Sequence, residues 1–255
     1  MIVLLEGRPW GATMKLTLRV VLALGLLLPL GAPIRGAQAD DFYITPADVN
    51  LEEMLAPPPL LGSDAQKADM KAVMDAQAAR TTDQVTASVK DFKKSIFRFG
   101  DVLGPGFTKV NLPFTDAFFK RVILNDSEII TAAKGYFMRP RPFITNDQVN
   151  PVMLRPGGGG YPSGHSTFAY VTAILLGIMV PEKRDALFAR ANDFASMRVI
   201  SGEHYPSDVA AGKVAAALMA NALLHSAKFM ADFKTSEVEV RRMLNLPPAP
   251  PTTSP

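Results

Sequence analysis

His165 is one of two histidines in this sequence whose neighbours suggest chemistry. It ends the run Tyr161-Pro162-Ser163-Gly164-His165, which follows four consecutive glycines at 157–160 and precedes a helical pattern. A glycine-rich loop that leads into a helix N-terminus presents free backbone N–H groups and the positive end of the helix dipole, which suit an oxyanion. Ser163 adds a hydroxyl donor, and Gly164 lets a ligand oxygen approach the backbone closely. The alternative is an ordinary N-cap followed by a solvent-facing histidine.

His204 is the second such histidine, and Asp208 follows it by four residues. Pro206 between them favours the first turn of a new helix, so the chain can bring the two side chains within reach. A carboxylate on one ring nitrogen fixes the tautomer and leaves the other nitrogen free for attack or proton transfer. Arg198 lies six residues before His204 and adds a positive charge. The alternative makes Asp208 a partner of the helix dipole and His204 a simple turn residue.

A third cluster is basic and contains Lys134 and Arg141. Pro140 and Pro142 disfavour helix at the residues before them, so the cluster is expected at a helix end. Arg suits a bidentate grip on phosphate, and Lys acts as a point charge. Taken alone, such a run is more typical of a solvated basic patch. Arg139 is interpreted as a residue of the surface or of the periphery of a site.

The elements that must position these residues are helical. Apolar residues recur every three to four positions in several segments, and no segment alternates apolar and polar residues as a strand would. We expect helices at about residues 63–80, 83–99, 113–137 (with a division near 125–127), 163–180, 182–199, 207–231 and 235–244, with a turn-rich passage over 140–162. His225, within one of these helices, is interpreted as structural.

These patterns predict an all-α fold, a helical bundle in one domain over residues 63–245. Residues 40–62 contain four prolines and predict an irregular N-terminal arm with one short helix. Residues 246–255 are rich in proline and predict a tail that is disordered or in polyproline II. We find no internal repeat.

Residues 1–39 are interpreted as a leader. Lys15 and Arg19 precede the apolar run Val20–Leu30, and Ala37-Gln38-Ala39 forms a small-x-small cleavage site. This pattern predicts a signal peptide that starts at Met14 and is cleaved after Ala39, which places the mature protein in the periplasm or outside the cell. Met1 as the true start and an uncleaved membrane anchor are the alternatives. No later segment is expected to span a membrane; residues 164–180 come closest.

Composition excludes some classes of partner and site. The net charge is +3, but the excess lies in the leader, and the rest of the chain is balanced. It therefore provides no composition argument for binding nucleic acid or an anionic membrane. The sequence has no cysteine, so disulfides and thiolate metal sites are impossible. We also find no convincing carboxylate–histidine ligand cluster, so we expect no metal and no cofactor.

Together the three clusters resemble the signature of the type-2 phosphatidic acid phosphatase and vanadium haloperoxidase superfamily. Its pattern reads Lys-x6-Arg-Pro, then Pro-Ser-Gly-His, then Ser-Arg-x5-His-x3-Asp. Within this superfamily, Gly-Tyr-Pro-Ser-Gly-His at 160–165 and Met-Arg-Pro-Arg-Pro-Phe at 138–143 are similar to the bacterial class A non-specific acid phosphatases. One position departs from the pattern, because Met197 replaces the serine before Arg198.

The resemblance implies a role for each matching residue. Lys134, Arg141 and Arg198 would neutralise phosphate oxygens, with Ser163 and the amide of Gly164 completing the binding site. His204 would attack phosphorus, and Asp208 would hold its other ring nitrogen. His165, starting protonated, would protonate the leaving oxygen. The substrates would be small phosphomonoesters and the product inorganic phosphate, with inhibition by vanadate expected.

Three rival functions stay open at this point. A vanadate-dependent haloperoxidase uses the same anion site, but those enzymes are generally much larger. A lipid phosphatase of the superfamily usually carries several spanning helices. A phosphate-binding protein without turnover would need only the cations and amides, not the paired histidines. The preferred alcohol, the balance between hydrolysis and phosphotransfer, and the oligomeric state, including a homo-oligomer as in many related enzymes, are not decided by the sequence.

Overall fold

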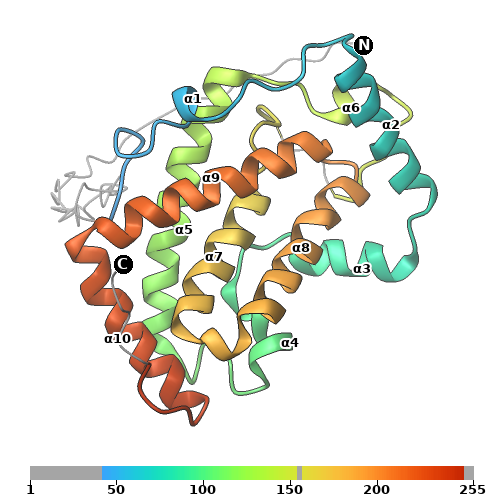
Figure 1. The fold of residues 1–255 in the computed structure, drawn as a ribbon. Helices are drawn as coiled ribbons and strands as arrows, with labels where there is room; N and C mark the ends of the chain where they lie inside the picture. The colour runs from blue at the N-terminus through green and yellow to red at the C-terminus, as the bar shows by residue number, and fades with distance from the viewer. Residues whose placement is uncertain (1–41, 154–156, 250–255) are drawn as a thin grey trace, which may run out of the picture. The chain divides into compact units, whose positions relative to one another are not determined.

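The computed structural model describes residues 42–153 and 157–249, and within these two ranges the chain forms helices joined by turns and loops, with no strand (Figure 1). The predicted all-α fold class is confirmed. The leader at 1–39 lies outside the described residues. The helices are α1 (Leu51–Met54), α2 (Asp64–Ala78), α3 (Thr82–Asp91), α4 (Gly100–Leu103), α5 (Pro113–Phe137), α6 (Pro142–Thr145), α7 (Gly164–Met179), α8 (Arg184–Ile200), α9 (Pro206–His225) and α10 (Ala227–Met243), with short 3-10 turns η2 (Ile96–Phe99) and η3 (Pro181–Lys183).

Helix α7 lies at the centre of the described fold and packs most extensively against α8 and α9 (Figure 1). It is apolar on nearly every side, as a helix surrounded by protein should be, and most of its residues are buried. Its first turn is joined directly to α9. The Ser163 amide donates to the Asp208 carbonyl at 3.0 Å, and the Ser166 hydroxyl donates to the Val209 carbonyl at 2.8 Å. The segments of His165 and His204 are therefore held side by side.

A glycine in α9 makes this close approach possible. A methyl group on the Cα of Gly212 would lie 2.7 Å from the Ser163 carbonyl oxygen and 2.8 Å from Ser166 Cβ. Neither atom belongs to the end of a flexible side chain, so a larger residue would push the two helices apart. Gly212 therefore sets the separation between the two histidine-bearing segments.

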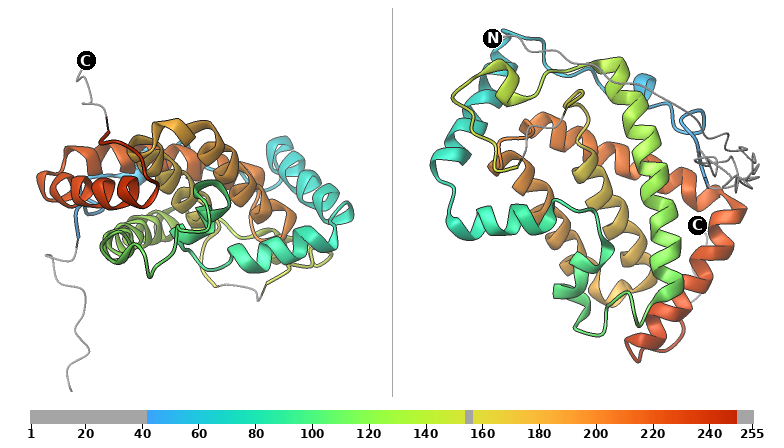
Figure 2. Two further views of the ribbon diagram at one scale, coloured as in Figure 1. Left: turned by 90° about the horizontal axis from the view of Figure 1, so that it is seen from below. Right: turned by 180° about the vertical axis from the view of Figure 1, so that it is seen from behind.

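Helix α5 runs for 25 residues without the division expected near 125–127. Its polar residues at this point make contacts across the fold instead of a turn. The Asn125 side chain accepts a hydrogen bond from the Tyr43 amide at 3.1 Å, and buried Asp126 pairs with Lys94. The first turn of α5 is hydrogen-bonded to α10, where Glu239 accepts from the Thr115 amide at 2.7 Å. The two helices lie alongside each other (Figure 2).

The helix expected over 83–99 is shorter in the structure. Helix α3 begins after a capping box formed by Thr81 and Gln84 and ends at Asp91. The Asp91 carboxylate is buried and accepts hydrogen bonds from Arg98 at 2.8 Å and from Arg190 at 2.7 and 2.9 Å. Residues 92–95 form a loop before η2, because the chain turns there to bring Arg98 to Asp91. The apolar spacing that suggested one helix therefore spans a break.

The helix expected over 207–231 is two helices. It ends at His225, because the Ser226 side chain caps α10 by accepting a hydrogen bond from the Phe229 amide at 3.4 Å. The polar helix expected at 235–244 is the second half of α10. The start of the tail is also held in place, since Arg241 Nε donates to the Pro247 carbonyl at 2.5 Å. Residues 250–255 of the expected tail lie outside the described residues.

Helix α9 corrects a further expectation. Within 42–153 and 157–249 it is the one helix long and apolar enough to cross a membrane, with 20 residues and a mean hydropathy of 1.2 over its most apolar window. No such segment was expected after the leader. In the structure 44% of this apolar stretch is buried inside the protein. A helix in a protein core can be as long and as apolar as a membrane-spanning one.

Candidate active site

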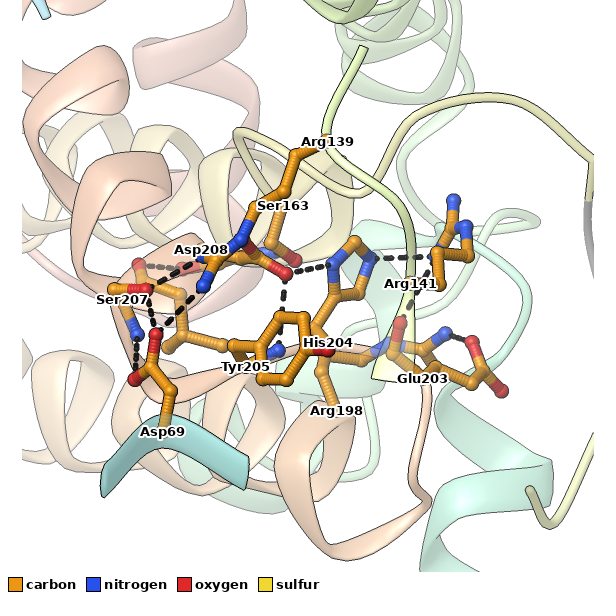
Figure 3. A network of polar contacts seen from close by, with 12 residues as sticks. Asp69, Arg139, Arg141, Ser163, Arg198, Glu203, His204, Tyr205, Ser207 and Asp208 are labelled. Carbon is orange, nitrogen blue, oxygen red and sulfur yellow. Dashed lines mark hydrogen bonds and ion pairs between the residues drawn. The ribbon is translucent and has the colours of Figure 1, made fainter. Parts of the chain in front are cut away.

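The imidazole of His204 lies between a carboxylate and a guanidinium (Figure 3). Its Nδ1 is 3.2 Å from Asp208 Oδ2, and its Nε2 is 3.1 Å from Arg141 Nη1. A guanidinium has only donors, so Nε2 must be the acceptor nitrogen and Nδ1 must carry the proton. His204 Nε2 is therefore unprotonated, and its lone pair accepts a hydrogen bond from Arg141.

The start of α9 explains why Asp208 reaches His204. Pro206 occupies the first turn, and the Tyr205 amide donates to Asp208 Oδ2 at 2.9 Å, as an acidic residue in the third position of a helix often accepts. The same Asp208 oxygen accepts a hydrogen bond from His204 Nδ1. Gly202 makes the preceding turn with φ of 76°, and the amides of Glu203 and His204 both donate to the Arg198 carbonyl at 3.1 Å.

Arg139 holds the other oxygen of Asp208, so of the two expected positions, the surface and the periphery of the site, it occupies the second. Its side chain is 2% exposed, and Nη1 is 2.5 Å from Asp208 Oδ1. The guanidinium also donates to Gln66 Oε1 at 2.5 Å and to Asp69 Oδ2 at 2.8 Å, and it lies 4.2 Å from the centre of the Tyr205 ring (Figure 3). Helix α2 is therefore linked through Arg139 to the carboxylate that orients His204.

Arg198 is fully buried at the end of α8 and pairs through Nη2 with the buried carboxylate of Glu203. Its Nε and Nη1 have no hydrogen-bond partner among the described residues, and the Nε of buried Arg141 has none either. Buried donors are almost always satisfied in folded proteins. These unpaired donors beside His204 are therefore suited to an anion with several acceptor oxygens.

His165 lies in the first turn of α7, between the rings of Phe92 at 5.9 Å and Phe194 at 6.4 Å. Its Nε2 is 2.7 Å from the Phe92 carbonyl oxygen. A carbonyl only accepts, so Nε2 carries a hydrogen and Nδ1 is the nitrogen available for proton exchange. The hydrogen bonds between the starts of α7 and α9 hold the segment of His165 beside the segment of His204. The structure therefore brings the two histidine segments together.

Lys134 lies on the face of α5 that carries Asp126 and Ile130, eight and four residues away. Its ammonium group has no hydrogen bond or ion pair with the other described residues, and burial together with the charges of Arg141 and Lys94 lowers its pKa to about 7. Lys134, Arg141 and Arg198 are here called the cation cluster; Arg141 contacts His204 directly, and after burial the charges of all three lower the pKa of His204. All three predicted cations are thus brought together.

Ser163 and Gly164 are buried where α7 begins. Ser163 is the N-cap, and its Oγ accepts from the Ser166 amide at 3.4 Å. Gly160, at the end of the glycine-rich run, is close to the same groups, since a methyl group on its Cα would lie 3.2 Å from Asp208 Oδ2. All eight predicted site residues therefore occur around the starts of α7 and α9 and the ends of α5 and α8.

Met197, which replaces the serine of the family pattern, lines a different cleft together with Asp91 and Arg190. Ser196 is exposed, and its hydroxyl donates to the Asp193 carbonyl at 2.9 Å within α8. None of the eight predicted site residues lines that cleft. Neither Met197 nor Ser196 is thus placed to compensate for the missing serine.

Burial and positive charge determine the protonation of the histidines. Burial, followed by the charges of Arg141, Lys134 and Arg198, lowers the pKa of His204 well below its usual value, so its ring is neutral. Burial and Arg198 likewise lower the pKa of His165. This differs from the expectation that His165 starts protonated. A phosphate dianion among these cations would raise the pKa of both rings, because it favours their charged forms.

Burial raises the pKa of the Asp208 carboxyl, and the charge and hydrogen bonds of Arg139 act against that shift. Burial also raises the pKa of Asp126, opposed by Lys94. Both carboxyls thus depend on a cation supplied by a distant segment.

Four residues near the site were missed by the sequence analysis: Asp69, Lys94, Asp126 and Glu203. Glu203 stands directly before His204 in the sequence, so its position was a usable signal. Asp69, Lys94 and Asp126 lie in segments with ordinary helical or loop composition, and no local signal distinguishes them. Among the described residues no three His, Asp or Glu side chains gather as a possible metal-binding group.

Comparison with known proteins agrees with this arrangement. Residues 121–230 match the family model described as the PAP2 superfamily, and they include all eight predicted site residues. Over this segment the chain is therefore similar to the PAP2 superfamily.

The names of similar proteins are more specific than the family description. The chain is 27% identical over 232 residues to an acid phosphatase of Zymomonas mobilis subsp. mobilis, covering 87% of this chain and 86% of the relative. It is 29% identical over 216 residues to a non-specific acid phosphatase of Salmonella typhimurium, covering 80% and 84%. The predictions of this family and of an enzyme of the acid phosphatase type are confirmed. A solved structure of the first transmembrane PAP2 type phosphatidylglycerolphosphate phosphatase from Bacillus subtilis aligns with a TM-score of 0.46 at 17% identity, covering 69% of this chain and 90% of that chain.

Proposed function

We propose that this chain is an exported acid phosphatase that hydrolyses a broad range of phosphomonoesters through a phosphohistidine formed on His204. The observation that carries the proposal is the position of His204. Asp208 holds Nδ1 at 3.2 Å, and the lone pair of Nε2 faces Arg141 at 3.1 Å. A neutral imidazole oriented in this way is a nucleophile that points at the place where a phosphate anion would be held.

In the first step, Nε2 of His204 attacks phosphorus and the bond from phosphorus to the ester oxygen breaks. The leaving oxygen takes a proton from Nδ1 of His165, which must be protonated before this step. The substrate dianion favours that protonation because it raises the pKa of His165, and the Nε2–H stays bonded to the Phe92 carbonyl. Asp208 stabilises the positive charge that develops on the His204 ring. The products of this step are the alcohol and phosphohistidine.

In the second step, water attacks the phosphohistidine and gives a proton to His165. The bond between phosphorus and Nε2 breaks, which releases inorganic phosphate and restores neutral His204. The cation cluster, with the Ser163 hydroxyl and the Gly164 amide, stabilises the charge on the phosphoryl oxygens in both steps. The unpaired donors of Arg141 and Arg198 support this role.

Trapping the intermediate in alkali tests the mechanism. After a millisecond reaction with a 32P-labelled aryl phosphate, wild-type protein quenched in alkali should carry label that is stable to base and labile to acid, as phosphohistidine is. His204→Ala should carry no label and show no turnover. Near-normal activity of His204→Ala would overturn the proposed nucleophile. Wild-type activity should be unchanged by a chelator and inhibited by vanadate.

Export is proposed on the leader pattern alone, because residues 1–39 lie outside the described structure. Expression of the full chain in a bacterium with Sec-dependent export should release a mature protein that begins at Asp40. Intact mass spectrometry of the periplasmic fraction measures this start directly. A protein retaining Lys15 and found only with membranes would contradict the proposed cleavage.

A further inference from the structure

The loop formed by residues 92–95 places a fourth cation beside the site. Lys94 extends from this loop to α5, where its Nζ pairs with the buried carboxylate of Asp126. A methyl group on the Cα of Gly164 would lie 3.5 Å from Lys94 Nζ. The ammonium group is therefore next to the helix start proposed to bind phosphate, although Lys94 belongs to none of the three sequence clusters.

The same loop surrounds the leaving-group side of the site. Phe92 supplies the carbonyl that holds His165, and its ring is stacked 5.9 Å from the imidazole. His165 is the proposed acid for the leaving oxygen, so the groups around it are the groups that the departing alcohol meets. Phe194, the second ring against the imidazole, is fully buried, whereas Phe92 is 41% exposed and the Lys94 side chain 20% exposed. Lys94 is thus a charged group on the loop that carries the exposed ring beside His165.

We propose that Lys94 binds a second negatively charged group on the alcohol part of the substrate, so that the enzyme prefers phosphomonoesters with an anionic leaving group. The inference rests on the proposed phosphatase function and names its preferred substrate class. A carboxylate or a second phosphate on the alcohol would each satisfy Lys94, since either accepts a charge-assisted hydrogen bond from an ammonium.

Two observations favour this role over direct binding of the transferred phosphoryl group. The cation cluster already supplies three charges around His204, and their unpaired donors are the buried ones. Lys94 also lines a pocket of about 170 Å³, whose lining includes Lys93, Lys109 and Lys120 and none of the eight predicted site residues. Asp116 is the acidic residue in that lining, and it already pairs with Lys120 at 2.7 Å. The surroundings of Lys94 away from the cluster are therefore basic and suit an extended anion.

The test compares two substrates that differ in charge but hardly in shape, 3-carboxyphenyl phosphate and 3-carbamoylphenyl phosphate. The measured quantity is the ratio of their kcat/KM values. Wild-type protein should prefer the carboxylate, and Lys94→Met should lower the ratio about tenfold, the effect of losing about 1.4 kcal/mol of interaction. Lys94→Arg should retain most of the preference. Effects of Lys94 on the proton chemistry of His165 cancel in the ratio, because both substrates use the same acid.

A substitution of Asp126 should change the ratio of kcat/KM values in the opposite direction. Asp126→Asn keeps Lys94 but removes the charge that competes with the substrate, so the ratio should rise several-fold. Lys94→Met leaves the buried carboxylate of Asp126 unpaired, which can prevent folding. The double variant Lys94→Met/Asp126→Asn removes that carboxylate as well and should fold even where the single variant does not. Its ratio should be as low as that of the single Lys94→Met variant.

Lys90→Met is the matched control, since it removes the same charge from an exposed position on α3. An equal loss of the ratio in Lys90→Met would overturn the inference, because the effect would then be long-range charge. An equal loss of activity on both substrates in Lys94→Met would also overturn it and assign Lys94 to the phosphoryl group. Hydrolysis of the carbamoyl ester without any carboxylate preference would refute only this inference. If wild-type protein hydrolysed neither ester, the proposed function itself would fall.

Discussion

Arg139 Nη1 lies 2.5 Å from Asp208 Oδ1, although 69 residues separate the two in the chain. Both side chains are almost fully buried, at 2% and 0% exposure. Asp208 uses its other oxygen for His204, so Arg139 supplies the charge that keeps the orienting carboxylate ionised inside the protein. The helix α2 residue Asp69 holds Arg139 in turn at 2.8 Å. The nucleophile is therefore oriented by a chain of charges that begins on a helix outside the sequence motifs.

Arg139→Met should lower kcat about 10–100-fold, the effect of losing a hydrogen bond to a charged group of about 1.5–3 kcal/mol. It should also lower stability by roughly 3–5 kcal/mol, because breaking a buried ion pair leaves its partner uncompensated. Steady-state kinetics and thermal unfolding measure the two effects. The acidic limb of the kcat profile against pH should shift to higher pH, since Asp208 is then protonated more easily.

Arg121→Met is the control for this prediction. Arg121 pairs with Asp232 at 2.9 Å, but both side chains are about one third exposed and lie away from the site. An exposed pair of this kind contributes at most about 1 kcal/mol. The kinetics of Arg121→Met should match the wild type. If Arg139→Met lost stability but kept kcat and the pH profile, Arg139 would be structural alone.

His165→Ala should reduce kcat/KM for an alkyl phosphate by about 10²–10⁴, as expected for loss of a general acid. Its effect on an activated aryl ester such as 4-nitrophenyl phosphate should be much smaller, because that leaving group departs without protonation. The matched control is His225→Ala. His225 is exposed at the end of α9, where its Nδ1 contacts the Asn221 carbonyl at 2.7 Å. Equal losses on both esters in His165→Ala would contradict the assignment of the acid.

The stabilising effect of neutral His204 should be lost in acid. Its pKa in the folded protein is well below the value of about 6.5 expected when unfolded. Between those values the unfolded state binds a proton that the folded state does not, so stability falls as the pH drops below about 6.5. Each pH unit costs at most about 1.4 kcal/mol from this group.

His204→Asn isolates this effect, because asparagine does not titrate. In phosphate-free buffer, lowering the pH from 7.5 to 5.5 should reduce the Tm of the wild type more than that of His204→Asn. The expected difference is about 2–4 °C for each kcal/mol in a protein of this size. Parallel Tm curves for the two proteins over this range would mean that the folded-state pKa of His204 is not lowered.

Gly212→Ala and Gly135→Ala should change stability in opposite directions. The new methyl group at position 212 would meet the Ser163 carbonyl at 2.7 Å, and forcing α7 and α9 apart should cost about 1–3 kcal/mol. At position 135, in α5, nothing lies within 4 Å, and alanine should stabilise the helix by about 0.5–1 kcal/mol. Urea unfolding measures both. A loss of stability in Gly135→Ala equal to that of Gly212→Ala would contradict the close approach of the two helices.

Much of the helical framework was predictable because its signals are local. Ser63 and Ser163 cap α2 and α7 where a serine precedes an apolar period, and the structure places both caps there. The break at Ser226 also has a serine cap, but this serine lies inside a continuous apolar pattern, so the break was missed. The expected division of α5 was wrong for a different reason. Asn125 and Asp126 are turn-forming residues by type, but their side chains are satisfied by Tyr43 and Lys94 from other segments.

The sequence by itself determined the reactive groups, because each cluster is a short run in which backbone conformation, charge and side-chain type are set by near neighbours. Only the tertiary structure decided how these groups are paired. Arg139 pairs with buried Asp208, Lys94 pairs with Asp126 beside the site, and Glu203 pairs with Arg198. The physical reason is that a buried charge is tolerated only beside its counter-charge, and most of these partners lie on segments far apart in the chain that meet only when the helices pack.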